Sequence, residues 1–197
     1  EVLAHRIAWT LLVVALLLAL SGRMAALRAA ARDRRTFGLL AAGAVLIAIN
    51  WLVFIYAVTE DRVLEAALGY FINPLVSVAF GLLVFKEHLR RVQWAALGLG
   101  TVAVVVLIAY YGGFPWVALV LAASFGTYGL VKKLAGVGAA EGLAAETVVL
   151  LAPALVYLAA AGGTFTTEGD DHALLLAASG PVTAVPLLLF AACVARV

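Results

Sequence analysis

Residues 23–35 read RMAALRAAARDRR, and residues 36–58 read TFGLLAAGAVLIAINWLVFIYAV. The first stretch carries five arginines, whereas the second contains no charged residue. An apolar helix of roughly 20 residues is long enough to cross the hydrocarbon core of a bilayer. Arginines beside such a helix keep that end in the cytoplasm. The two stretches therefore predict a membrane crossing together with its orientation.

The composition extends this prediction to the whole chain. The apolar fraction is 66% and the mean hydropathy is +1.14 over 197 residues. A water-soluble domain of this size could not bury so much apolar surface. The net charge of +2 is too small to indicate nucleic-acid binding, so we expect no nucleic-acid partner. Cys193 is the only cysteine, which excludes a disulfide within these residues and a metal site made of thiolates.

Seven apolar runs are long enough, or nearly so, to cross a membrane. The alternation typical of β-barrel strands is absent, and a helix pairs its backbone groups within its own segment. We therefore predict an all-α fold, a polytopic membrane helix bundle. The predicted spans are residues 2–20, 36–58, 63–85, 92–110, 115–131, 142–162 and 173–195. The chain begins and stops within apolar runs, so we expect it to lack residues at both ends.

The polar gaps between these runs differ in charge. Ten of the thirteen Lys and Arg residues lie in gaps 21–35, 86–91 and 132–138. The alternate gaps together hold only Arg62. By the positive-inside rule, the three basic gaps face the cytoplasm. We interpret these clusters chiefly as topology anchors, with contact to lipid phosphates as the alternative. Membrane lipids are the partner that this layout predicts.

Polar groups inside a hydrocarbon span cost free energy, so they are candidates for function. In the first span, Glu1 and His5 lie one helical turn apart, with Arg6 beside them. They are interpreted either as snorkelling interfacial groups or as an outward-facing gate. Glu146, near the cytoplasmic start of the sixth span, is a candidate for a gate or for proton coupling.

Polar and aromatic residues within two other spans are candidates for the lining of a substrate cavity. Asn50, Trp51 and Tyr56 belong to the second span, and Ser124 and Tyr128 belong to the fifth. A buried amide such as Asn50 must find a partner, so it either joins two helices or lines a pocket. Hydroxyl groups commonly bond to their own helix and are weaker indicators.

The third span combines further cavity candidates around a proline. It contains Glu65, Tyr70, Asn73 and Pro74. Proline removes a backbone donor and disfavours helical geometry in the residue before it, so we predict that this span kinks or locally unwinds. Pro181 and Pro186 are predicted to break the seventh span in the same way, and Pro186 joins the cavity candidates. Glu65 is predicted to be interfacial, or to couple protons if it faces a cavity.

Several stretches resemble a known family. They are residues 50–58, NWLVFIYAV, residues 64–75, LEAALGYFINPL, and residues 125–133, FGTYGLVKK. Together with residues 1–9, EVLAHRIAW, they are similar to the EamA-type permeases of the drug/metabolite transporter superfamily. The similarity covers essentially the whole chain.

The resemblance implies an architecture and an activity. Members of this family are taken to have ten spans in two inverted five-span repeats. Residues 1–110 would then be the first repeat without its first helix, and residues 111–197 the second repeat without its last two. The implied protein is a secondary transporter of the bacterial inner membrane. It would move a small organic solute by alternating access, with protons as a candidate coupling ion and no cofactor.

Other classes stay open as alternatives. A non-transporting membrane scaffold or a lipid scramblase fits the same composition. An intramembrane protease needs a Ser and a His in partnership, and no histidine occurs in the second to sixth spans. A retinal receptor needs a lysine within a span, but Lys86, Lys132 and Lys133 lie in polar gaps. We predict no catalytic residue and no metal site, and no motif names the substrate, the direction of transport or the oligomeric state.

Overall fold

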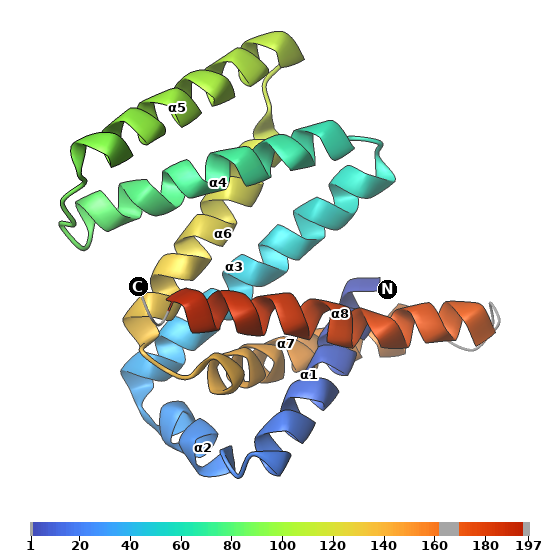
Figure 1. The fold of residues 1–197 in the computed structure, drawn as a ribbon. Coiled ribbons are helices and arrows are strands. Elements are labelled where there is room, and N and C mark those ends of the chain that lie inside the picture. The colour runs from blue at the N-terminus through green and yellow to red at the C-terminus, as the bar shows by residue number, and fades with distance from the viewer. Residues whose placement is uncertain (1, 162–169, 195–197) are drawn as a thin grey trace. The chain divides into compact units, whose positions relative to one another are not determined.

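The computed structural model describes residues 2–161 and 170–194, which fold into helices joined by short connections (Figure 1). The helices are α1 (Val2–Leu20), α2 (Met24–Arg32), α3 (Arg34–Thr59), α4 (Val63–Leu83), α5 (Arg91–Tyr111), α6 (Trp116–Ala135), α7 (Ala139–Ala161) and α8 (Asp170–Val194). No strand occurs in this described part of the chain. The predicted all-α fold class is therefore confirmed.

Seven of these helices are long and apolar enough to cross a membrane. They match the seven predicted spans, with ends that differ by up to four residues. Many of their large apolar side chains stay at least 60% exposed, among them Leu99, Val102, Val156, Leu174 and Leu175. Lipid tails are as apolar as leucine, so such side chains need no cover from protein. The chain is a multi-pass membrane helix bundle.

The remaining helix, α2, lies inside gap 21–35, where no helix is predicted. Its sequence is rich in alanine, which has the highest helix propensity. Gly22 makes the turn before it with a φ of 67°, a conformation that glycine adopts without strain. Asp33 follows α2 with an extended backbone and accepts a hydrogen bond of 2.9 Å from the backbone N–H of Thr36. Asp33 therefore ends α2 and caps the start of α3.

The helices that contain prolines continue without interruption, which corrects the prediction of local unwinding. α4 is a continuous α-helix through Pro74, and α8 is continuous through Pro181 and Pro186. Each proline removes one backbone hydrogen bond, whereas unwinding would expose several backbone groups. Since no water is available in hydrocarbon to pair those groups, the helices keep their remaining hydrogen bonds.

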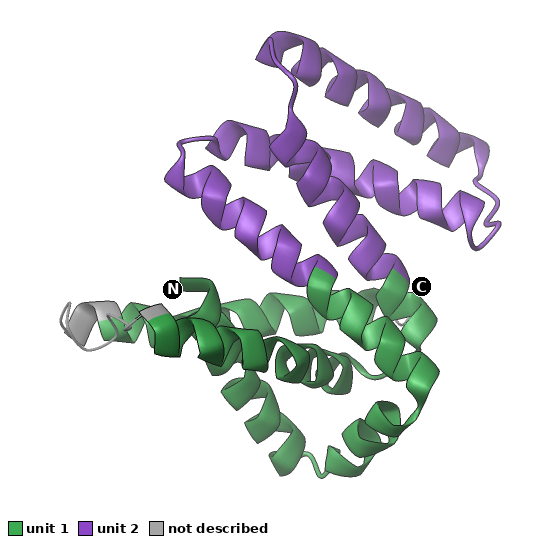
Figure 2. Ribbon diagram, turned by 180° about the vertical axis from the view of Figure 1, so that it is seen from behind, with its two compact units in different colours: residues 1–45, 131–197 green, residues 46–130 purple. Residues whose placement is uncertain are grey.

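Contacts divide the chain into two compact units (Figure 2). Unit 1 comprises Glu1–Val45 and Val131–Val197, and unit 2 comprises Leu46–Leu130. Helices α3 and α6 are each divided between the two units. The units do not follow the predicted boundary between repeats at residue 110, and that boundary stays a prediction.

In unit 2, small residues let α4 and α6 approach closely. A Cβ atom on Gly69 would lie 3.0 Å from the carbonyl oxygen of Ala118, and one on Gly126 would lie 2.5 Å from Val76. The early part of α4 contacts the early part of α6, and the later part of α4 contacts the later part of α6. The two helices therefore run in the same direction. Glycine contacts of this kind are common between membrane helices. The apolar core around them consists of Leu68, Ile72, Val104, Ala118 and Ala122.

A second apolar cluster in unit 2 joins α3 to α4 and α6. It consists of Ala57, Ala66, Val117 and Leu121. The rings of Tyr56 and Trp116 also meet, with centroids 5.5 Å apart. Since these residues lie late in α3 and early in α6, the two helices run in opposite directions. Two spanning helices, α4 and α5, lie between them in the chain, so α3 and α6 must cross a membrane in opposite directions.

In unit 1, α1 packs against both α7 and α8. The backbones of α1 and α8 come close, because a Cβ atom on Gly180 would lie 2.6 Å from the carbonyl carbon of Trp9. The buried Thr10 hydroxyl donates a hydrogen bond of 3.5 Å to the Gly180 carbonyl. Gly180 therefore sets the distance between these two helices.

We expect Gly180→Ala to destabilise the protein by about 1–3 kcal/mol, because the added methyl group meets backbone atoms that cannot move aside. Denaturant unfolding of the purified protein in detergent measures this loss. Gly98→Ala is the matched control, since nothing lies within 4 Å of a Cβ atom at that position. The control should be neutral or slightly stabilising. Equal losses in the two variants would contradict the role of Gly180 in packing.

Candidate functional site

Asn50 joins α3 to α6 near the middle of both helices. Its side-chain nitrogen donates hydrogen bonds of 3.0 Å to the Leu121 carbonyl and to the Ser124 hydroxyl. Ser124 in turn donates to the Leu121 carbonyl at 3.2 Å. A carbonyl can only accept, so this arrangement directs the amide nitrogen of Asn50 toward α6. Both Asn50 and Ser124 are buried, so the bonds tie two membrane helices together.

A small cavity lies beside this polar junction within unit 2. It has a volume of ≈ 10 Å³ and is lined by Asn50, Gly69, Tyr70, Asn73, Leu121 and Phe125. That space holds about one water molecule. Three predicted cavity residues therefore meet here, namely Asn50, Tyr70 and Asn73, and Ser124 is bonded to one of them.

Asn73 lies at the midpoint of α4, ten residues from either end of the helix. Its side-chain oxygen is buried and accepts no hydrogen bond from any described residue. A buried polar atom without a partner destabilises a protein by about 1–3 kcal/mol and is rare in native structures. Held beside a cavity, such an acceptor is suited to receive a hydrogen bond from a bound molecule.

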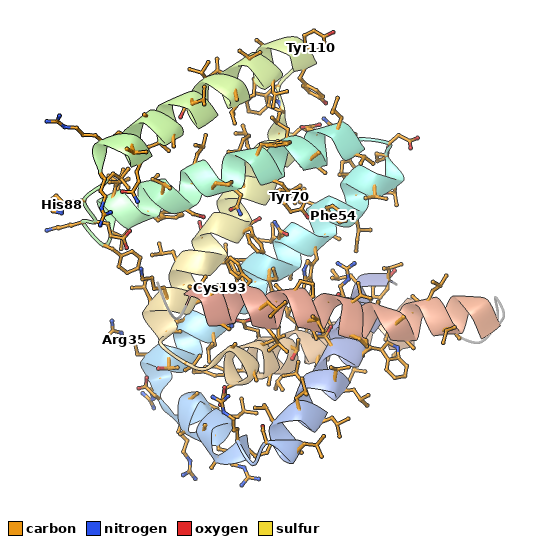
Figure 3. All side chains as sticks on the ribbon, in the orientation of Figure 1. Arg35, Phe54, Tyr70, His88, Tyr110 and Cys193 are labelled. Atoms are coloured by element: carbon orange, nitrogen blue, oxygen red, sulfur yellow. The ribbon has the colours of Figure 1, made fainter. Side chains whose placement is uncertain are left out.

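Aromatic rings surround the same cavity. Tyr70 is 60% exposed and meets Phe54 of α3 edge to face, with ring centroids 6.3 Å apart (Figure 3). Phe125 meets the ring of Tyr128 at 5.9 Å. Tyr128 and Trp51 are both buried, but neither lines the cavity. Of these two predicted residues, Tyr128 packs against a residue that lines the cavity, Phe125.

Glu65, at the start of α4, connects three elements of unit 2. Its carboxylate is fully buried and accepts a hydrogen bond of 2.8 Å from the backbone N–H of Val117. The Tyr111 hydroxyl donates to it at 2.9 Å, and Arg62 pairs with it at 2.6 Å. Val117 is the second residue of α6, so Glu65 caps that helix from a neighbouring helix. Glu65 is not among the residues that line the cavity.

Arg62 completes the site around Glu65. Its guanidinium group lies 5.2 Å from the centre of the Trp116 ring, a cation–π distance. Hydrogen bonding to Tyr111, with smaller contributions from Tyr56 and from the charge of Glu65, raises the pKa of Arg62. Arg62 therefore stays positively charged at physiological pH. Tyr56, a predicted cavity residue, belongs to this site through its contact with Trp116.

In unit 1, a buried ion pair joins α6 to α7. The ammonium nitrogen of Lys132 lies 3.0 Å from a carboxylate oxygen of Glu146, and the side chains are 4% and 1% exposed. Gly142 makes room for the ammonium group, since a Cβ atom there would lie 2.5 Å from the nitrogen. Helix α6 reaches Ala135, so the predicted gap 132–138 begins inside a helix and Lys132 is not a simple surface anchor.

The remaining predicted site residues are spread over several parts of the chain. His5 is buried and Arg6 partly buried, both on α1. Glu1 lies outside the described residues. Pro74 and Pro186 are exposed on α4 and α8.

Comparison with known proteins gives this arrangement a context. The profile of the EamA-like transporter family matches residues 2–109. The chain belongs to this family. No solved structure matches it.

Among the relatives of this EamA-family chain are several proteins named RarD. RarD of Streptomyces exfoliatus is 52% identical over the whole chain, which covers 64% of that relative. RarD of Escherichia coli K12 is 40% identical over the whole chain, which covers 68% of it. An uncharacterized transporter of Pseudomonas aeruginosa is 43% identical over 96% of the chain and 65% of its own length. The chain thus spans about two thirds of these relatives, and the predicted resemblance is confirmed.

Several residues that build these sites carry no recognisable signal in the sequence. Lys132 stands in a basic gap beside Lys133, where it cannot be told from a topology anchor. Arg23 of gap 21–35 pairs at 2.8 Å with Glu141 of α7, which directly precedes the predicted span 142–162. Tyr111, whose hydroxyl donates to Glu65, stands in the gap between the predicted spans 92–110 and 115–131. These pairings depend on how helices pack, so no local pattern reveals them.

Glu65→Ala is expected to destabilise the protein by roughly 3 kcal/mol, because Arg62 and the N-terminus of α6 lose their buried partner. Unfolding in detergent, followed by tryptophan fluorescence, measures the change. Glu60→Ala is the control, since Glu60 is an exposed carboxylate in the connection between α3 and α4, and its loss should change stability by less than about 0.5 kcal/mol. A loss for Glu65→Ala no larger than the control would show that this carboxylate does not hold α6.

Proposed function

We propose that the protein is a secondary transporter of the bacterial inner membrane that moves a small organic solute by alternating access. Membership of the EamA-like transporter family and the seven apolar helices support this proposal. Its relatives include an uncharacterized transporter and a protein named chloramphenicol-sensitive protein RarD, both from Pseudomonas aeruginosa. Because the chain spans 64% of the RarD of Streptomyces exfoliatus, the activity of the whole protein is part of the proposal.

One observation carries the proposal: carboxamides from two helices flank a cavity deep within the membrane spans. Asn73 is at the midpoint of α4, and Asn50 lies nine residues before the end of α3. Polar groups at such depth are unfavourable in hydrocarbon and commonly mark pathways for solutes or ions. A solute that donates a hydrogen bond to Asn73 would satisfy an acceptor that has no partner among the described residues.

The lining of the cavity indicates the kind of solute. Its six residues include two amides, a tyrosine and a phenylalanine, but no ionised side chain. The part of the solute held here is accordingly uncharged, donates hydrogen bonds and carries an apolar or aromatic surface. Since the cavity of ≈ 10 Å³ holds only about one water molecule, the helices must separate to admit a solute. An alternating-access cycle supplies that movement, with the present arrangement as a closed state.

Two related repeats, residues 1–110 and 111–197, belong to the same proposal. An offset of 140 residues places α1 on α7, and five of the six buried residues of α1 then fall on buried residues of α7. The coinciding pairs are Ala4 with Ala144, His5 with Ala145, Ile7 with Thr147, Thr10 with Leu150, and Val14 with Ala154. Both helices therefore bury the same face. An odd number of spans in each repeat inverts the second repeat relative to the first.

Asn73→Ala separates a role in transport from a role in folding. Because the Asn73 oxygen bonds to no described residue, its removal should not lower thermal stability. Uptake into proteoliposomes should fall about tenfold, the equivalent of one lost hydrogen bond to the solute. The assay uses a panel of uncharged solutes that includes chloramphenicol.

Thr101→Ala is the control for that assay, since the Thr101 hydroxyl bonds only to Leu97 of its own helix. It should leave uptake unchanged. Equal uptake by the wild-type protein and Asn73→Ala would refute the assigned site. If the wild-type protein moved none of the solutes but transferred fluorescent lipids between leaflets, a lipid scramblase would replace the transporter.

Glu146 is the carboxylate best suited to couple transport to protons. Its partner Lys132 is buried with it, so protonation of Glu146 would remove the ion pair between α6 and α7 and shift the balance between conformations. Glu65 is less suited, because Tyr111, Arg62 and the backbone N–H of Val117 all hold its carboxylate in place as the cap of α6.

An uncoupler is expected to reduce uptake by the wild-type protein severalfold but to leave uptake by Glu146→Gln unchanged. Glutamine keeps an acceptor for Lys132 while removing the group that titrates. Glu141→Gln is the control, since it changes another buried glutamate on α7 and should preserve the response to the uncoupler. If the uncoupler leaves wild-type uptake unchanged, the proposed proton coupling is wrong. That result would not affect the test at Asn73.

A further inference from the structure

Four exposed arginines gather on α2 and at the start of α3. Arg28 and Arg32 lie one helical turn apart on α2, and Arg34 and Arg35 begin α3. None of the four forms a salt bridge with a carboxylate among the described residues, although the charge of Arg35 contributes to lowering the pKa of Asp33. Arg35 extends away from the ribbon at this corner of unit 1 (Figure 3). These four residues are called the arginine surface below.

The acidic groups near the arginine surface are already engaged. Asp33 accepts hydrogen bonds from the hydroxyl and the backbone N–H of Thr36, and these bonds lower the pKa of Asp33. Glu141 is buried and pairs with Arg23. When both carboxylates are counted against the five arginines of residues 23–35, three positive charges remain. Like charges so close together repel one another, so an external anion would stabilise this surface.

The neighbouring helices hold α2 at the membrane surface. It connects α1 to α3, both of which are long and apolar enough to cross a membrane. It also packs against α7, to which the Arg23–Glu141 pair fastens its start. No residue of α2 is buried, and its least exposed positions, Leu27 and Ala30, lie opposite Arg28 and Arg32 on the helix. A helix with one cationic and one apolar side lies in the plane of the membrane interface.

We propose that the arginine surface binds the phosphate groups of anionic phospholipids in the cytoplasmic leaflet. The positive-inside rule accounts for the presence of arginines on this side of the membrane. It does not require them to line one side of a helix, as Arg28 and Arg32 do. One guanidinium group can donate two parallel hydrogen bonds to a phosphate group. Two arginines one helical turn apart are therefore suited to bind a lipid headgroup. A bound lipid would also offset the repulsion within the cluster.

The test compares phosphatidylglycerol with phosphatidylcholine as additives to the protein in detergent, with thermal unfolding as the readout. The wild-type protein is expected to bind phosphatidylglycerol more tightly. In the double variant R28Q/R32Q this preference should fall about fivefold for each arginine, or roughly 25-fold in all. K86Q/R91Q removes the same charge from exposed positions in gap 86–91, and it should keep the preference.

Two further conditions keep the test decisive even if a variant folds poorly. Raising the salt concentration of the wild-type sample from about 50 mM to about 500 mM should abolish the preference, because salt screens exposed charges. A preference that resists salt, or that survives in R28Q/R32Q, overturns the proposal. An equal loss of the phosphatidylglycerol preference in R28Q/R32Q and K86Q/R91Q also overturns the proposal, since the preference would then depend on the total positive charge of the protein. A thermal shift of the same size with inorganic phosphate would assign the surface to a free anion and not to a lipid.

Discussion

Hydrocarbon offers a polar group no partner, and this constraint determines which contacts the protein must make internally. Each buried charged side chain among the described residues accordingly has an ionic partner. Glu65 has Arg62 and the N-terminus of α6, Glu146 has Lys132, and Glu141 has Arg23. Apolar side chains face outward without penalty, which reverses the distribution found in water-soluble proteins.

The same constraint explains how the helices hold together. Lipid is as apolar as a leucine side chain, so burying apolar surface between helices supplies little driving force. Association then depends on close contact and on polar bonds between helices. Gly69, Gly126 and Gly180 provide the close contacts, and Asn50 and Glu65 provide bonds between helices that are distant in sequence. Continuous helices through Pro74 and Pro186 follow from the same need to keep backbone groups paired.

A polar atom that this constraint leaves unsatisfied is therefore informative. The carboxylate of Glu65 is fully bonded and acts as a helix cap, which accounts for its burial without any ligand. Asn73 differs, because its buried oxygen lies beside a cavity and accepts no bond from the described residues. In a member of the EamA-like transporter family, that contrast supports the proposal that Asn73 contacts the solute, whereas Glu65 is a structural residue.

Length, hydropathy and loop charge are local properties, so the sequence by itself determined the seven spans and the fold class. It also singled out Asn50, Tyr70, Asn73 and Ser124, because polar groups stand out within apolar runs. Only the tertiary structure decided which of these residues meet, since Asn50 and Ser124 are 74 positions apart. It likewise showed that Lys132, which in the sequence resembles a topology anchor, is the buried partner of Glu146. The physical reason is that pairing depends on helix rotation and distance of approach, which small residues far away in the chain control.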